Sequence, residues 1–135
     1  MVNEKTIFLL DGVGAAASFV LLGGVLPALQ DLIGMPVDRL YLLCAAPAIF
    51  MVYDVGVVRW ANHRQSGWLI GIIVANLSYC VLSATLIVQH LDDLTALGLG
   101  YFIAELLVLL ALVYYEGIML YRLMARETPH SLSKP

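Results

Sequence analysis

Four long apolar runs constrain the fold of this chain more than any other feature of its sequence. They cover residues 6–29, 40–58, 68–88 and 97–121. Each is close to the roughly 20 residues that an α-helix needs to cross the hydrocarbon of a bilayer. The runs are too long for barrel strands and lack a strict polar–apolar alternation. We therefore predict an all-α integral membrane protein with four transmembrane helices.

Composition agrees with a chain whose surface meets lipid. The sequence is 61% hydrophobic and 13% charged, whereas soluble domains average about 25% charged residues. The connections between the runs are short, so consecutive helices are expected to be antiparallel neighbours in an up-down-up-down bundle. We expect residues 1–126 to form this transmembrane domain in a lipid bilayer. Residues 127–135 are polar, contain two prolines, and are predicted to be a disordered cytoplasmic tail.

The distribution of basic residues predicts the orientation of the bundle. Arg39 is the only one of the seven Lys and Arg residues on its side of the predicted membrane. That side also carries Asp31, Asp38, Asp92 and Asp93. By the positive-inside rule, both termini and the middle connection are cytoplasmic, as in a multi-pass protein of the cell membrane. There is no basic cluster or recognised motif for nucleic acid, so no nucleic-acid partner is expected. The remaining basic residues are Lys5, Arg59, Arg64, Arg122, Arg126 and Lys134.

Four carboxyl residues fall inside the predicted spans: Asp11, Asp54, Glu105 and Glu116. A charged side chain at the centre of a membrane helix costs about 2.5–3.5 kcal/mol on insertion scales, so such residues usually face the bundle interior and mark functional sites. Asp11, Asp54 and Glu116 each lie five or six residues from the nearest basic residue of their helix, or about 8–9 Å inward of it. The three are therefore predicted to share one level near the cytoplasmic face.

Glu105 is expected to lie deeper than the other three acids. It precedes Glu116 by eleven residues, or about three turns, so both belong to one face of the fourth helix. No basic residue lies at its depth, and we expect a hydrogen bond from a Tyr or Asn side chain. The segments 53–56 and 115–117, Tyr-Asp-Val-Gly and Tyr-Glu-Gly, also resemble each other. They indicate two halves related by an axis along the membrane normal.

The leading hypothesis is a transporter or channel-like protein that binds a proton, a cation or a small cationic molecule. Asp54 and Glu116 would bind the cargo, Asp11 would lie at the cytoplasmic mouth, and Glu105 would be a deeper proton-titratable group. Four helices are few to enclose a complete transport pathway across the membrane, so a homodimer is expected. Three neutral residues are predicted to add hydrogen bonds: Asn76, Tyr79 and Tyr115.

Two other classes of function remain open at this point. The acids could instead hold helices together in a small non-catalytic subunit or lipid-binding protein, with Glu116 paired to Arg59 as a structural ion pair. A membrane-embedded enzyme acting on a lipid head group would use the carboxylates as acid–base groups or as ligands for a divalent metal. The sequence contains no catalytic motif, which argues against an enzyme. No cofactor is expected, and the sequence does not decide whether a metal binds.

Overall fold

The computed structural model describes residues 4–60 and 65–127, and the regular secondary structure of this part of the chain is helical, without strands. The prediction of an all-α fold is therefore confirmed. The predicted disordered tail lies, from residue 128 onward, outside the described residues. The elements are α1 (Glu4–Val20), η1 (Leu21–Val25), α2 (Leu26–Ala28), α3 (Gln30–Ile33), α4 (Val37–Trp60), α5 (Gln65–Gln89) and α6 (Ala96–Glu127).

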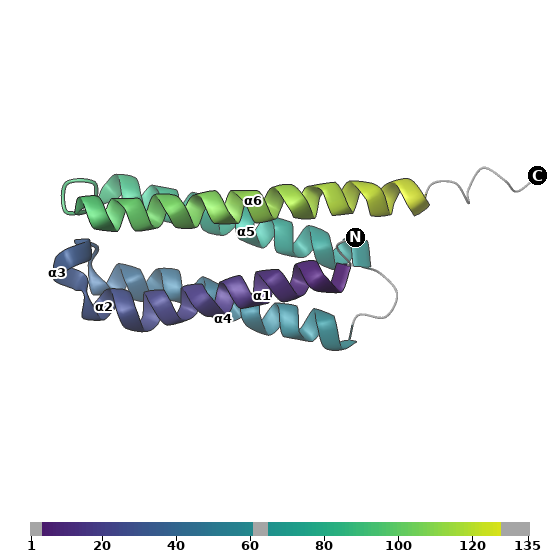
Figure 1. Ribbon diagram of the computed structural model, residues 1–135, viewed down its shortest axis with the longest axis horizontal. Coiled ribbons are helices and arrows are strands. Elements are labelled where there is room, and N and C mark those ends of the chain that lie inside the picture. The colour runs from purple at the N-terminus through teal and green to yellow at the C-terminus, as the bar shows by residue number, and fades with distance from the viewer. Residues whose placement is uncertain (1–3, 61–64, 128–135) are drawn as a thin grey trace, which may run out of the picture.

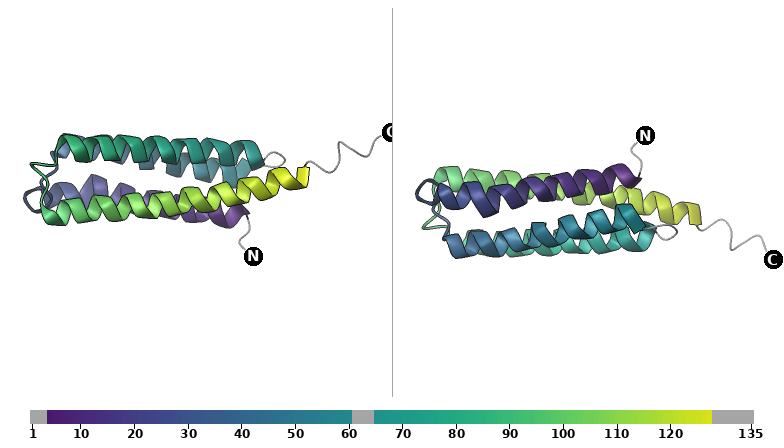
Figure 2. Two further views of the ribbon diagram at one scale, coloured as in Figure 1. Left: turned by 90° about the horizontal axis from the view of Figure 1, so that it is seen from above. Right: turned by 90° about the horizontal axis from the view of Figure 1, so that it is seen from below.

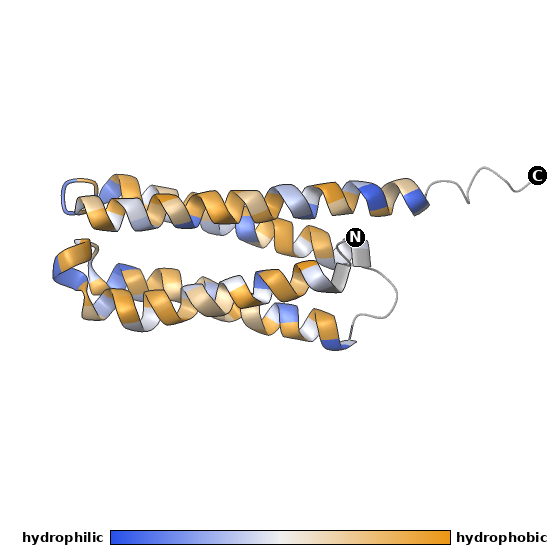
Figure 3. Ribbon diagram, in the orientation of Figure 1, coloured by the Kyte–Doolittle hydropathy of each residue, from blue (hydrophilic) through white to orange (hydrophobic). Residues whose placement is uncertain are grey.

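Four helical segments are long and apolar enough to cross a membrane, as the sequence predicted. They are Thr6–Ala28, Val37–Trp60, Ser66–Gln89 and Ala96–Arg126. Figure 3 shows apolar residues along most of their length, with hydrophilic residues around α3 and near the end of α6. This architecture is compatible with a small membrane protein.

The four long segments lie side by side with nearly aligned axes (Figures 1 and 2). α1 packs mainly against α4, and α5 packs mainly against α6, whereas α1 and α6 meet only lightly. The N-terminus lies at one end of the bundle, which we call the N-terminal end. At the opposite end lie α2, α3 and the connection from α5 to α6. The weak contact between α1 and α6 leaves room for the cavity described below.

The first segment is not a regular α-helix throughout, which the sequence analysis did not predict. Residues Leu21–Val25 form a π-helical turn, and the Leu26 N–H donates to the carbonyl of Leu21. Pro27 follows directly, and because proline has no N–H it cannot continue the α-helical hydrogen-bond ladder. The wider turn therefore lies where the ladder is already interrupted, as is common for π-bulges.

A clasp of backbone and side-chain bonds joins α3 to the start of α6. Thr95 N–H donates to the Ile33 carbonyl at 3.1 Å, and the Thr95 hydroxyl donates to the Leu32 carbonyl. The same hydroxyl oxygen accepts the Gly98 N–H at 3.0 Å, so Thr95 is the N-cap of α6. At Gly98 a β-carbon would collide with the Ile33 carbonyl oxygen. Glycine is thus required there by the close approach of two backbones.

The apolar core is divided into two clusters along the bundle. The smaller cluster lies toward the N-terminal end and includes Phe8, Val57 and Ile72, while the larger one includes Leu22 and Phe102. Between these clusters, one buried residue on each of α1, α4 and α5 is polar: Asp11, Asp54 and Asn76. They form the layer in which the candidate site lies.

Candidate functional site

Each of the four long helices contributes one buried polar side chain to a single layer. Asp11 of α1, Asp54 of α4, Asn76 of α5 and Glu116 of α6 are 3%, 2%, 1% and 0% exposed. We call these four residues the carboxyl–amide quartet. The Asn76 side-chain N–H₂ donates to Asp11 Oδ1 at 2.9 Å and to Glu116 Oε1 at 3.3 Å. Asp54 lies close enough to both other acids to interact with them electrostatically.

Helical periodicity explains why these polar side chains point inward. Residues three or four apart share a face of a helix. Asp11 follows Phe8 by three residues, Asp54 precedes Val57 by three, and Asn76 follows Ile72 by four. Phe8, Val57 and Ile72 belong to the smaller apolar cluster. Burial of that cluster therefore carries the polar side chains of the next turn into the interior.

Within residues 4–60 and 65–127, no ion pair joins the quartet to a basic side chain. The ion pair found in the described residues joins Arg39 to Asp38 at 3.3 Å, both of them largely exposed. The alternative in which Glu116 pairs with Arg59 is therefore absent from the described part of the structure. Five buried oxygen atoms of the quartet have no hydrogen-bond partner: Asp11 Oδ2, both Asp54 oxygens, Asn76 Oδ1 and Glu116 Oε2. Buried polar atoms are nearly always paired, so unpaired ones require an explanation.

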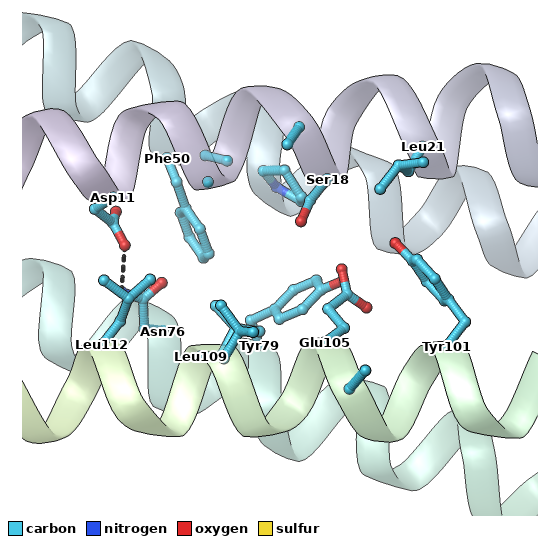
Figure 4. A pocket seen from close by; sticks show the side chains of 16 residues that line it. Asp11, Ser18, Leu21, Phe50, Asn76, Tyr79, Tyr101, Glu105, Leu109 and Leu112 are labelled. Atoms are coloured by element: carbon cyan, nitrogen blue, oxygen red, sulfur yellow. Dashed lines mark hydrogen bonds between the residues drawn. The ribbon is translucent and has the colours of Figure 1, made fainter.

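A second polar group surrounds Glu105, which is partly buried on α6. The Tyr79 hydroxyl donates to Glu105 Oε1 at 3.2 Å, which is the kind of hydrogen bond expected from the sequence. The hydroxyls of Ser18 and Tyr101 also lie within hydrogen-bonding reach of this carboxyl group. Figure 4 shows Glu105 pointing from α6 toward Ser18 on α1. Glu105 Oε2 is left without a partner.

A cavity of about 270 Å³ between α1 and α6 connects the two polar groups. Asp11 and Asn76 line one end of it, and Glu105 and Tyr101 line the other (Figure 4). The remaining lining is almost entirely apolar. Pro47 and Phe50 come from α4, and the rest come from α1, η1 and α6: Gly14, Ala15, Ala17, Leu21, Ala104, Val108, Leu109 and Leu112. Tyr79 of α5 also lines it.

Asp54 is reached from a different side of the bundle. A second cavity of about 370 Å³ lies between α1 and α4, and Asp54 and Arg59 are among the residues that line it. Gly12 of α1 lies in the same cavity, and a β-carbon there would contact Asp54 Oδ2 at 3.7 Å. The quartet therefore separates one cavity that reaches Asp11 from another that reaches Asp54.

No protein-family model matches the chain, and neither a curated protein nor a solved structure resembles it significantly. The chemistry of the site has to be argued from its own geometry. Within residues 4–60 and 65–127, no group of three His, Cys, Asp or Glu residues is arranged to hold a metal ion. The quartet offers carboxyl and amide oxygens to a hydrogen-bond donor.

The structure brings six of the seven predicted site residues to this region. Asp11, Asp54, Asn76 and Glu116 form the quartet, while Glu105 and Tyr79 lie along the cavity. Tyr115 is not part of either group. Its side chain is 64% exposed, and it lines a separate groove with Leu10 and Arg122. Its ring packs against Tyr114 with the ring centres 6.1 Å apart.

Two further polar residues, Ser18 and Tyr101, line the cavity, and their spacing from the acids already predicts a shared polar face. Ser18 follows Asp11 by seven residues, and Tyr101 precedes Glu105 by four, so each lies on the same helical face as its acid. Phe50 carries no such signal, because nothing in the sequence tells which apolar residues of α4 face the gap between α1 and α6.

Proposed function

We propose that the protein is a four-span integral membrane protein that binds a proton or a small cation at the carboxyl–amide quartet, in a transporter or channel-like role. The bundle would run up-down-up-down through the cell membrane with both termini cytoplasmic. The distribution of charge supports this orientation. Arg59, Arg122 and Arg126 end α4 and α6 at the N-terminal end, whereas Asp31 and Asp38 lie in α3 and the first turn of α4.

The observation that carries the proposal is the convergence of three buried carboxyl groups that have no basic partner among the described residues. Two unit charges about 4 Å apart repel by about 4 kcal/mol at an effective dielectric constant of 20. Three ionised carboxylates in one buried layer would repel one another more strongly still. The quartet is therefore stable only when it holds one or more protons or another cation. This bound proton or cation is the species that the site can exchange.

The positions of the cavities support exchange rather than permanent binding. Asp11 and Asn76 line the cavity between α1 and α6, whereas Asp54 lines the one between α1 and α4 beside Arg59. A proton or cation held between Asp11 and Asp54 can thus be reached from two sides. The described residues offer no three-ligand metal arrangement, and this favours a proton or a monovalent cation over a divalent metal.

Proton flux in liposomes tests this proposal directly. Wild type, Asp54→Asn, Glu116→Gln and the double variant are reconstituted, a potassium–valinomycin potential is imposed, and a dye in the lumen reports pH. We expect a flux in wild type that falls at least about tenfold in the double variant, because positioned proton-transfer groups typically contribute factors of about 10²–10⁴. Asp92→Asn is the matched control, since Asp92 is exposed in the connection from α5 to α6. An undiminished flux in the double variant would remove the quartet from the mechanism.

One observation favours a second candidate, a non-catalytic subunit whose quartet serves assembly. Asn76 bridges Asp11 and Glu116, and so joins α5 to both α1 and α6. In that case the neutral variants would lose stability or assembly together with flux, whereas the transport proposal requires folded variants with low flux. Mass photometry of the same detergent samples distinguishes the two. It also tests the homodimer that we propose for a four-helix chain.

A further inference from the structure

The cavity between α1 and α6 combines an apolar lining with carboxyl groups at its two ends. Its volume is about 270 Å³, close to the lower end of the usual range of small-molecule sites. We propose that this cavity binds an apolar organic ammonium ion of about ten non-hydrogen atoms, with Glu105 as its counter-ion. The cavity and Glu105 support this site by themselves. Only a coupling between ammonium binding and protons of the quartet rests on the function proposed above.

The polar atoms left free in the cavity are all hydrogen-bond acceptors. Glu105 Oε2, Asp11 Oδ2 and Asn76 Oδ1 have no partner, and Asp11 and Asn76 are at least 97% buried. None of the described residues that line the cavity is basic. A ligand that donates hydrogen bonds or carries positive charge complements these atoms, whereas an anion would meet two carboxyl groups.

The surroundings of Glu105 hold its carboxyl group toward the cavity. Tyr79 donates to Oε1, and Ser18 and Tyr101 approach the same carboxyl group from α1 and α6. Oε2 has no hydrogen-bond partner, and the carboxyl group points into the space between α1 and α6 (Figure 4). Phe50, Tyr79 and Tyr101 also place aromatic rings along the lining, and aromatic faces attract ammonium ions.

The mouth of the cavity suits a ligand that arrives from an apolar phase. Ala17 of α1 and Ala104 of α6 line the cavity and are also exposed on the outer surface of the bundle. Small side chains at these two positions leave the gap between the helices open. An apolar lining of this size does not hold a column of water well, which favours an amphipathic organic cation over a hydrated inorganic one.

Equilibrium binding of tritiated benzyltrimethylammonium to the full-length protein in nanodiscs tests the proposal. Neopentylbenzene is the control competitor, because it has the same shape with carbon in place of the charged nitrogen. We expect saturable binding in wild type. Neopentylbenzene should compete at least about tenfold more weakly than unlabelled benzyltrimethylammonium, because only the ammonium ion is attracted electrostatically to Glu105 and to the aromatic faces. Glu105→Gln should lower the affinity by a similar factor, and Ala104→Phe should abolish binding by filling the mouth.

Asp92→Asn is the matched control, since Asp92 is exposed and does not line this cavity, and it should bind like wild type. Absence of saturable binding, equal competition by the neutral hydrocarbon, or full affinity in either Glu105→Gln or Ala104→Phe would each overturn the proposal. Proton flux through the quartet is measured separately on Asp54→Asn. Ammonium binding that persists while the flux is unaffected by the quartet substitutions would therefore contradict the proposed function and leave this inference intact.

Discussion

Replacing Asn76 by leucine should destabilise the bundle, because Asn76 is the hydrogen-bond donor within the quartet. The substitution keeps a similar volume and removes two bonds, to Asp11 Oδ1 at 2.9 Å and to Glu116 Oε1 at 3.3 Å. Interhelical hydrogen bonds in membrane proteins average about 0.6 kcal/mol and reach about 1.7 kcal/mol. Two such bonds give a loss of about 1–3 kcal/mol in the free energy of unfolding, since both acceptors are carboxyl groups in a buried layer.

The loss can be measured by SDS titration of the protein in dodecylmaltoside micelles, with helix content followed by far-ultraviolet circular dichroism. Ser78→Ala is the matched control on the same helix. Ser78 is exposed and donates only to the Val74 carbonyl of its own helix at 2.8 Å, so its loss should change stability by less than about 0.5 kcal/mol. If Asn76→Leu unfolds at the same SDS fraction as Ser78→Ala, the quartet does not join the helices as described.

Three further substitutions test other parts of the structure. Gly98→Ala should lower the free energy of unfolding in the same SDS titration by about 1–3 kcal/mol, because its β-carbon would meet the Ile33 carbonyl oxygen. Gly100→Ala is the control on the same helix, since a β-carbon there meets open space, and it should not destabilise the protein. Thr95→Ala should cost about 1 kcal/mol in that assay through loss of the N-cap of α6, and an unchanged midpoint would contradict the clasp. Tyr115→Phe should leave proton flux in liposomes unchanged, because the side chain lies outside the quartet and the cavity; a large drop would return Tyr115 to the site.

The sequence predicted the helices because their number and length follow from hydropathy alone. The common level of Asp11, Asp54 and Glu116 was also predictable. Counting residues inward from a basic residue gives depth along a helix, since the rise per residue is fixed at about 1.5 Å. Their convergence was not certain from counting, because depth does not determine helix rotation. The apolar neighbours one turn away, such as Val57, supplied that information only once the packing was known.

The exposed position of Tyr115 has a simple physical cause. Adjacent residues on a helix point about 100° apart, so an inward Glu116 requires Tyr115 to point away from the layer. The tyrosines of the similar segments 53–56 and 115–117 differ in their surroundings. Asp54 and Glu116 are both buried, but Tyr53 donates to the Trp68 carbonyl at 2.9 Å while Tyr115 is exposed. The cavity could not be predicted, because it depends on which helix faces lie apart.

The clasp at Thr95 has a mechanical consequence for the gap between α1 and α6. It fixes the segment that follows α1 to the first turn of α6, at the end of the bundle remote from the N-terminus. Any widening of that gap is then a rotation about this pivot. Displacements grow with distance from the pivot, so a given rotation moves Glu116 farther than Tyr101. A small rotation at the clasp would thus separate the side chains of α1 and α6 more at the acidic layer than around Tyr101.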